Sequence, residues 1–327
     1  MRSTKRPVKA FSAAGWIVVW LISFSPPASG EVYPNKPIMI YCGYEAGATL
    51  DVTIRALARG VETLLGSPVV VENKAGGGAT ICATLVAKKK PDGYTLGAIA
   101  SAALTVQPHL VKVAFDPVKD FTFLCEYGSY IYGLCVRADS PIKNIDEFIA
   151  YARAHPDLSY GSPGTNNPPQ IAVELLAQCK GLTFRHVPFK GGAPANTALL
   201  GKHLDFVAGA GQHLQYVKQG NFRLLLQLAA EKRDPSYPDI PILHELGCQD
   251  ARPSKYMVIA PKGVPEDVST KLDDTFRKVA ASSDFQNLLR NLNVPSIYRN
   301  KSDMDRDIPA DMAWYKDFLT KVKAKKE

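Results

Sequence analysis

The sequence lacks the short motifs that many enzymes and metalloproteins of this size carry. It has no G-x-S-x-G, no G-x-G-x-x-G and no G-x-x-x-x-G-K-[ST], so a hydrolase nucleophile elbow and two common nucleotide-binding loops are absent. Its six histidines include no H-E-x-x-H, and its six cysteines include no C-x-x-C. These absences disfavour an enzyme, a metal site and a bound cofactor.

A strong excess of positive charge is also lacking once the first 30 residues are set aside. The chain has 39 basic and 31 acidic residues, and four of the basic residues lie in positions 1–30. The remainder is therefore 35 against 31. The basic runs at 88–90 and 321–326 contain no interleaved aromatic residues, so nucleic-acid binding is disfavoured.

Long apolar runs are missing except near the start. Four basic residues precede the apolar stretch Ala10–Phe24, which is followed by Pro26-Pro27-Ala28-Ser29-Gly30. This order is typical of a secretory signal peptide, and the small residues Ala28 and Gly30 predict cleavage after Gly30. The alternative is a retained membrane anchor, but the stretch is shorter than the ~20 residues that span a bilayer. We predict an exported, periplasmic protein with residues 1–30 removed.

The cysteine pattern does not define a disulfide arrangement. Six cysteines allow fifteen complete pairings. Cys125 and Cys135 flank a short Gly/Tyr-rich segment and are the most plausible local pair, whereas buried free thiols are the alternative. The six cysteines are Cys42, Cys82, Cys125, Cys135, Cys179 and Cys248.

Hydrophobic periodicity indicates strands that alternate with helices. Predicted strands are 38–41, 69–72, 95–100, 121–125, 133–137, 159–161, 184–188, 206–208, 223–228 and 255–260. Predicted helices are 52–65, 145–155, 168–179, 193–200, 265–282 and 283–292. About 300 residues after the leader exceed one ordinary core, so two domains are expected. The alternation predicts an α/β fold with mainly parallel sheets, whose ligands bind beyond the carboxyl ends of the strands.

The loop at 42–51 is the most informative segment, because it joins a predicted strand to an amphipathic helix. Ala46, Gly47 and Ala48 are small and should leave backbone N–H groups accessible. A helix beginning around Thr49 would add its positive end, which predicts a cradle for a carboxylate. The alternative is an ordinary turn in which Thr49 or Asp51 only caps the helix.

Three more loops follow predicted strands and open predicted helices. Residues 72–82 contain Gly76-Gly77-Gly78, which permits close backbone approach. Residues 160–170 place short hydrogen-bonding side chains before a helix, either as ligand donors or as caps. Lys190 in the loop 190–194 either offsets an acid or faces solvent.

Five stretches in order resemble one known family. They are VYPNKPI at 32–38, VVVENK at 69–74, PDGYTL at 91–96, YGS at 160–162 and HVPFKGGAPA at 186–195. Together they resemble the Bug-type extracytoplasmic solute receptors, the substrate-binding proteins of tripartite tricarboxylate transporters. The resemblance runs from about residue 32 to the C-terminus, and HVPFKGGAPA is its most specific part.

The resemblance implies a two-lobed periplasmic-binding-protein fold of type II-like form, a cleft ligand and no enzymatic activity. It implies a first lobe of 31–126 and 229–327 and a second lobe of 127–228. The ligand would be an aliphatic di- or tricarboxylate or an aromatic acid, the partners would be permease subunits, and the receptor would be a monomer without cofactor. The implied ligand-binding residues are Tyr44, Glu45, Ala46, Gly47, Ala48, Thr49, Asp51, Gly77, Gly78, Thr80, Ser101, Ser162, Gly164, Thr165, Asn166, Asn167, Lys190, Gly191 and Gly192.

Departures from the family pattern bear on the ligand. Glu45 adds a carboxylate to the first loop, and Asn166, Asn167 and Gln170 replace the usual small residues and histidine. The family's acidic residue after Asp205 is missing from the run 206–211, which favours a plain carboxylate over an amino acid. Tyr127, Tyr130 and Tyr132 either wall a pocket for an aromatic acid or pack at the hinge.

Two other functions remain as alternatives. The same receptor fold can serve a membrane sensor kinase instead of a permease, and the sequence does not separate these roles. An exported α/β hydrolase is disfavoured, because no activated nucleophile is visible.

Overall fold

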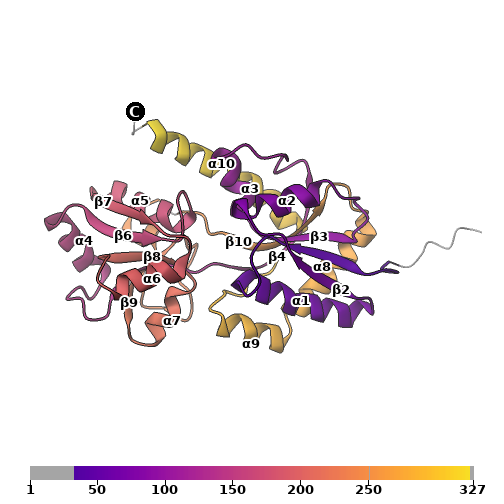
Figure 1. Cartoon of the computed structure of the whole chain (residues 1–327), viewed down its shortest axis with the longest axis horizontal. Coiled ribbons are helices and arrows are strands. Elements are labelled where there is room, and N and C mark those ends of the chain that lie inside the picture. Colours follow the sequence, from indigo (N-terminus) through magenta and orange to yellow (C-terminus); the bar gives the residue numbers. More distant parts are fainter. Residues whose placement is uncertain (1–32, 250, 325–327) are drawn as a thin grey trace, which may run out of the picture. The chain divides into compact units, whose positions relative to one another are not determined.

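The computed structural model describes residues 33–249 and 251–324, so the predicted signal peptide lies outside the described residues. The described chain forms two β-sheets with helices on both faces of each, as the strand and helix alternation predicted (Figure 1). The strand order is β11-β4-β10-β3-β1-β2 in the first sheet and β7-β6-β8-β5-β9 in the second. Within the described residues, no helix is long and apolar enough to span a membrane.

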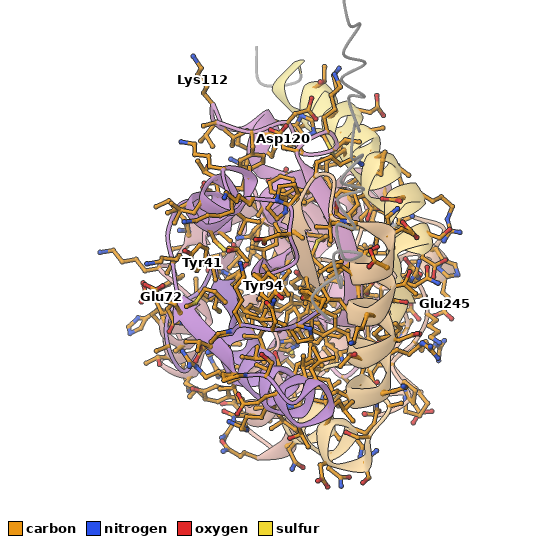
Figure 2. All side chains as sticks on the ribbon, turned by 90° about the vertical axis from the view of Figure 1, so that its right-hand side faces the viewer. Tyr41, Glu72, Tyr94, Lys112, Asp120 and Glu245 are labelled. Carbon is orange, nitrogen blue, oxygen red and sulfur yellow. A yellow bond between two sulfur atoms is a disulfide. The ribbon has the colours of Figure 1, made fainter. Side chains whose placement is uncertain are left out.

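The first sheet contains β1 (Ile38–Cys42), β2 (Val69–Asn73), β3 (Thr95–Ala100), β4 (Phe121–Ser129), β10 (Lys255–Pro261) and β11 (Arg299–Asn300). Strands β2 and β3 pair parallel to β1, which places the loops after all three at one edge. The register pairs Tyr41 with Glu72, and these two side chains lie close together in Figure 2.

Period-two alternation buries both faces of the first sheet. In β10, Tyr256 and Val258 join one core cluster, while Met257 and Ile259 join the other. Helices α1 (Thr49–Leu65), α8 (Glu266–Ala280) and α9 (Ser283–Asn291) cover the first of these faces. Helix α2 (Thr80–Ala87), helix α3 (Ala102–Thr105) and the start of α10 (Lys301–Ala324) cover the other, with the short turn η2 (Gln107–His109) following α3.

The second sheet contains β5 (Tyr132–Arg137), β6 (Leu158–Ser162), β7 (Phe184–Pro188), β8 (Phe206–Ala210) and β9 (Phe222–Leu228). Helices α4 (Ile145–Ala154) and α5 (Pro168–Lys180) pack on one face, and α6 (Gly192–Leu200) and α7 (His213–Lys218) on the other. The turn η3 (Leu243–Leu246) follows β9. Ile242, just before it, bridges to Gln227 of β9, so this segment is attached to the second sheet.

The strands next to the chain crossings are antiparallel. Strand β10 runs antiparallel to β3 and β4, and β5 runs antiparallel to β8 and β9. Both sheets are therefore mixed, whereas alternation alone predicted mainly parallel sheets. The reason is that β4 leads to β5, and β9 leads to β10, in the other sheet, so neither connection is a helical crossover within one sheet.

The C-terminal helix α10 was not predicted, because Pro309 lies inside it and its apolar pattern changes there. Before Pro309, Met304 and Ile308 are buried in a core of the first sheet. Beyond it, Tyr315, Phe318 and Leu319 join a core of the second sheet. One helix thus contributes to the cores of both sheets.

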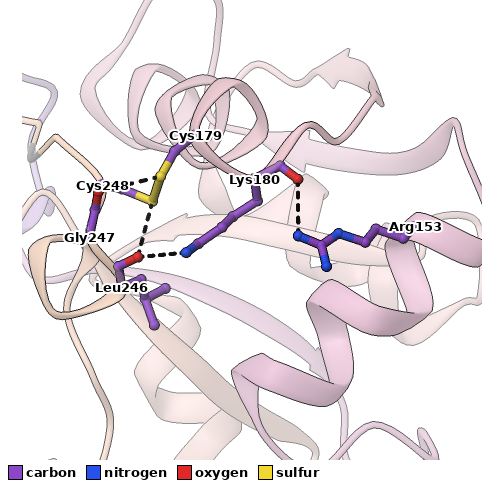
Figure 3. Close-up of a disulfide and its surroundings, with 6 residues drawn as sticks. All are labelled: Arg153, Cys179, Lys180, Leu246, Gly247 and Cys248. Carbon is purple, nitrogen blue, oxygen red and sulfur yellow. Dashed lines mark hydrogen bonds between the residues drawn. A yellow bond between two sulfur atoms is a disulfide. The ribbon is translucent and has the colours of Figure 1, made fainter.

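The disulfide joins Cys179 to Cys248, with Cα atoms 5.5 Å apart (Figure 3). The predicted local pair Cys125 and Cys135 is wrong, because these residues lie on strands of different sheets and both are buried free thiols. Beside the disulfide, Lys180 Nζ donates to the Leu246 carbonyl at 2.6 Å. The end of α5 and the turn η3 are therefore joined covalently and by a hydrogen bond.

We expect the double substitution Cys179→Ala and Cys248→Ala to lower the free energy of unfolding by about 2–5 kcal/mol, because the disulfide constrains the unfolded chain. Urea unfolding with and without reductant measures this. Reduced wild type should match the variant, and unreduced wild type in denaturant should show four reactive thiols. Six thiols, or no effect of reductant, would contradict the pairing.

Candidate functional site

The loops after β1 and β2 pack directly against each other. A Cβ atom on Gly43 would lie 2.6 Å from Cβ of Ala79, so only glycine permits this approach. The Asn73 side-chain amide donates to the Tyr44 carbonyl at 2.9 Å, and the Lys74 N–H donates to the Cys42 carbonyl at 2.6 Å. These contacts make the two loops one unit at the carboxyl edge of the first sheet.

Helix α1 begins at Thr49, as predicted, but no side chain caps it. Ala48 occupies the N-cap position with extended backbone angles and cannot accept a hydrogen bond through its methyl group. The first intrahelical bond runs from the Val52 N–H to the Ala48 carbonyl. The N–H groups of Thr49, Leu50 and Asp51 thus have no intrahelical acceptor, which leaves a donor cluster at the positive end of a 17-residue helix.

Two of the N–H groups predicted to be accessible are used within the loop. The Gly47 N–H donates to Asp51 Oδ2 at 3.0 Å, and the Ala48 N–H donates to the Glu45 carbonyl at 3.1 Å. The prediction that Gly47 and Ala48 leave open donors is therefore wrong, because the loop turns back on itself. The unused donors are instead the N–H groups of Thr49, Leu50 and Asp51, in the first turn of α1.

Asp51 orders this loop. It is 3% exposed, and its carboxylate accepts hydrogen bonds from Gly47, Arg55 and Asn73 at 2.7–3.0 Å. Burial alone raises the pKa of Asp51, but the hydrogen bonds from Gly47 and Asn73 and the charge of Arg55 together hold the pKa below its usual value. The carboxylate is therefore ionised at neutral pH and engaged within the loop.

The glycine loop after β2 forms the short turn η1 (Gly77–Ala79). Gly78 has φ of 63°, and its missing side chain leaves room for the Gln107 amide, 2.9 Å from an added Cβ. Thr80 Oγ1 donates to the Gly77 carbonyl at 2.9 Å. Gln107 is a polar neighbour of this loop that sequence reasoning missed.

Ser101, at the end of β3, is committed to the adjacent strand. Its N–H donates to the Lys255 carbonyl at 2.9 Å, and its Oγ accepts from the Lys255 N–H at 3.0 Å. The residue is buried. These bonds connect β3 to the start of β10, so Ser101 fixes the position of the following turn.

In the second sheet, the loops after β6 and β7 are joined at Ser162. Its Oγ lies 2.8 Å from both the Gly164 carbonyl and Nε2 of His186. The Phe189 N–H donates to the Ser162 carbonyl at 3.0 Å. Buried Ser162 therefore holds the two loops together, while Thr165 and Asn166 lie exposed beyond it.

Helix α5 offers no free backbone donor in its first turn. Pro168 and Pro169 lack an N–H, and the Gln170 N–H donates to the capping Asn167 Oδ1 at 3.1 Å. The Asn167 Oδ1 atom is thus occupied, but Nδ2 of the same amide is a buried donor without a hydrogen-bond partner. An added Cβ on Gly164 would lie 3.5 Å from this nitrogen. The side chain, not the helix backbone, supplies the unused donor.

Helix α6 provides backbone N–H donors at Gly192 and Ala193 in its first turn, whereas Pro194 has no N–H. Gly191 is its N-cap, and no side chain caps the helix. Lys190, just before it, is exposed. The Gln212 carboxamide lies 2.9 Å from an added Cβ on Gly192, so Gln212 is a second polar neighbour that the sequence did not reveal.

The sequence-derived residues thus form two groups. Tyr44 to Asp51, Gly77, Gly78, Thr80 and Ser101 gather at the edge of the first sheet, and Ser162 to Asn167 with Lys190 to Gly192 gather at that of the second. Among the described residues, no hydrogen bond or ion pair joins the groups. Glu45, Ala46 and Gly47 are exposed, and Tyr44 contacts Tyr130 on the chain crossing.

The tyrosines of the crossing have separate positions. Tyr127 is buried beside Phe285 and Tyr256, which is packing. Tyr130 stacks on Tyr132 with ring centroids 5.6 Å apart.

Across residues 33–249 and 251–324, no group of three or more metal-binding side chains is placed to hold an ion.

Comparison with known proteins places these features in a family. Residues 53–323 match the sequence model of a protein family described as "Tripartite tricarboxylate transporter family receptor". A protein of Cupriavidus necator, "UPF0065 protein in gbd 5'region", is 37% identical over 293 residues, which cover 89% of each chain. BugT of Bordetella pertussis is 29% identical over 76% of this chain and 77% of its own length.

Solved structures of periplasmic binding proteins have a fold similar to that of this chain. MatC from Rhodopseudomonas palustris with bound malate is 25% identical, with a TM-score of 0.73, covering 88% of this chain and 100% of that one. An R. palustris protein with adipate is also 25% identical, with a TM-score of 0.76, covering 88% and 97%. The chain has the two-lobed periplasmic-binding fold and belongs to the Bug-type receptors of tripartite tricarboxylate transporters.

Proposed function

We propose that this protein is an exported, periplasmic receptor that captures a small carboxylate and delivers it to the permease of a tripartite tricarboxylate transporter. The observation that carries the proposal is the uncapped start of α1, where three backbone N–H groups have no intrahelical acceptor. A carboxylate is the natural acceptor for such a donor cluster. The relatives bound to malate and adipate support this ligand class.

The two groups of loops have complementary roles in this proposal. The first lobe holds one carboxylate on α1 and the neighbouring glycine turn. The second lobe contributes the Asn167 amide and the N–H groups that open α6. A ligand that contacts both lobes favours the closed state by its differential affinity for that state, and the closed state is what the permease recognises. No bond in the ligand is made or broken, so no enzymatic step is proposed.

The second lobe favours a plain carboxylate over an amino acid. Two acids of the second lobe are already engaged: Asp205 precedes β8 and accepts hydrogen bonds from Ser159 at 2.7 and 2.8 Å, and Glu174 accepts one from Gln170 at 2.7 Å. Asp205 is therefore held at the opposite end of its strand from the loops, and Glu174 is occupied by Gln170. An α-ammonium group would find no dedicated carboxylate among the second-lobe site residues, and desolvating it without a partner is costly.

We expect malate or adipate, added at 100 times its dissociation constant, to raise the free energy of unfolding by about 2.7 kcal/mol. Thermal unfolding of residues 31–327 with a panel of aliphatic, aromatic and amino-acid carboxylates measures the effect. The matching diamides should give no shift. An aspartate or glutamate dissociation constant below ~10 µM would contradict the preference for a plain carboxylate.

Ala48→Asp provides a sharper test, because it places a capping carboxylate at the proposed ligand position. We expect the variant to have a free energy of unfolding about 1 kcal/mol higher than that of wild type, since aspartate is a strong N-cap and alanine is a poor one. Dicarboxylate binding measured by calorimetry should weaken more than tenfold. Ala48→Asn supplies a cap without charge and should weaken binding less. Undiminished binding by both variants would remove the α1 terminus from the site.

A further inference from the structure

A cavity lies where the chain crosses between the two sheets, and we call it the crossover cavity. Its volume is about 590 Å³, within the range of small-molecule sites. Its walls come from residues 126–132, 227–236, 253–255 and 290–299. None of the residues assigned to the proposed carboxylate site lines it, so its occupant needs a separate account.

One buried polar group in this cavity has no hydrogen-bond partner. Glu126, on β4, is 1% exposed, and its Oε2 accepts no hydrogen bond. The nearest cation is Arg299, whose Nε is 3.7 Å away. Buried polar atoms are rarely left unpaired, since an unpaired atom loses its hydrogen bonds to water and gains none in return. An oxygen left in this state beside an open cavity points to a ligand atom or water that completes it.

The body of the cavity is largely apolar and aromatic. Tyr130 and Tyr132 are stacked on one side, and Leu228, Val294 and Ile297 supply aliphatic surface. Such walls suit a ring or a branched carbon chain and give a small polar molecule little to bind. The occupant must therefore combine an apolar body with one polar end.

Two cations at the cavity have no acidic partner. Three of the lining cations are paired, because Lys255 contacts Asp311, Arg233 contacts Glu245 and Arg299 contacts Asp307. Lys232 and Arg290 also line the cavity and form no ion pair within the described residues, although Arg290 Nη2 donates to Asn287 Oδ1. The cavity can therefore accept one negative charge without breaking an existing ion pair.

Glu126 adds a donor rather than a competing charge. Burial raises the pKa of this carboxyl group to about 8, although Lys255 of β10 and Arg299 of β11 act in the opposite direction. Glu231 and Asp307 also face it and raise the pKa further. A carboxyl group whose pKa is raised in this way can take up a proton near neutral pH and then donate a hydrogen bond to an anionic oxygen.

We propose that the crossover cavity is a second ligand site, which binds a monocarboxylate with an aromatic or branched apolar body. The apolar part lies against Tyr130, Tyr132 and Ile297. The carboxylate is placed between Lys232 and Arg290 and accepts a hydrogen bond from Glu126. This site shares no lining residue with the carboxylate site at α1, and the two meet where Tyr130 contacts Tyr44.

The test uses residues 31–327 with benzoate as the probe and benzamide as its uncharged analogue, measured by calorimetry. Ala230→Phe fills the cavity and should weaken benzoate binding at least 30-fold. The double variant Lys232→Gln with Arg290→Gln leaves the apolar walls and should weaken it about tenfold. Lys218→Gln, an exposed lysine on α7, is the matched charge control and should change nothing. Thermal unfolding without ligand checks that each variant folds.

The outcomes separate the two sites. Benzoate binding that is lost in Ala230→Phe, weakened in the charge variant and retained in Ala48→Asp supports the crossover site. Binding that is lost in Ala48→Asp and retained in the other variants places benzoate at α1 and overturns the proposal. Failure of wild type to bind benzoate, or equal binding of benzamide, also overturns it. The malate and adipate measurements report on the proposed function independently of these results.

Discussion

The proposed site depends on one feature, the absence of a side-chain cap on α1. A helix end normally satisfies its first N–H groups with a serine, threonine, aspartate or asparagine at the N-cap. Here Ala48 occupies that position, and the nearby Asp51 carboxylate turns back to Gly47. The donors of the first turn are left for an external acceptor. In the proposed function, this small stability cost in the free protein becomes a source of affinity for a carboxylate.

The rest of the first lobe holds that helix end in place. Parallel pairing of β1 with β2 and β3 brings three loops to one edge, and the contact at Gly43 lets two of them touch. Arg55 and Asn73 fix Asp51, so the loop between β1 and α1 is ordered before any ligand arrives. Such preorganisation reduces the entropy that binding must overcome.

Much of this fold could be predicted from sequence, because buried strands and amphipathic helices leave clear periodic patterns. All ten predicted strands are found, and α1 begins at Thr49 as expected. The failures have physical reasons. The pairing of Cys179 with Cys248 and the proximity of Gln107 to Gly78 and of Gln212 to Gly192 arise from contacts between distant segments. Pro309 obscured α10, and the antiparallel pairings involve strands at which the chain passes from one sheet to the other.

At the predicted site, sequence identified the correct loops but not which groups remain available. Gly47, Ala48 and Ser162 use their hydrogen-bonding groups internally, and the two prolines remove the donors of α5. Asn167 Nδ2 and the first turn of α1 remain unused. Local sequence defines where donors lie, whereas three-dimensional contacts decide which of them are already occupied.

The most direct measurement of the central claim is the NMR amide proton shift of Thr49, Leu50 and Asp51 during titration with adipate and with adipamide. Hydrogen bonding to a carboxylate should move at least two of these three resonances downfield in a saturable way with adipate, and adipamide should leave them in place. If adipate binds while these resonances stay unchanged, the start of α1 does not hold the ligand.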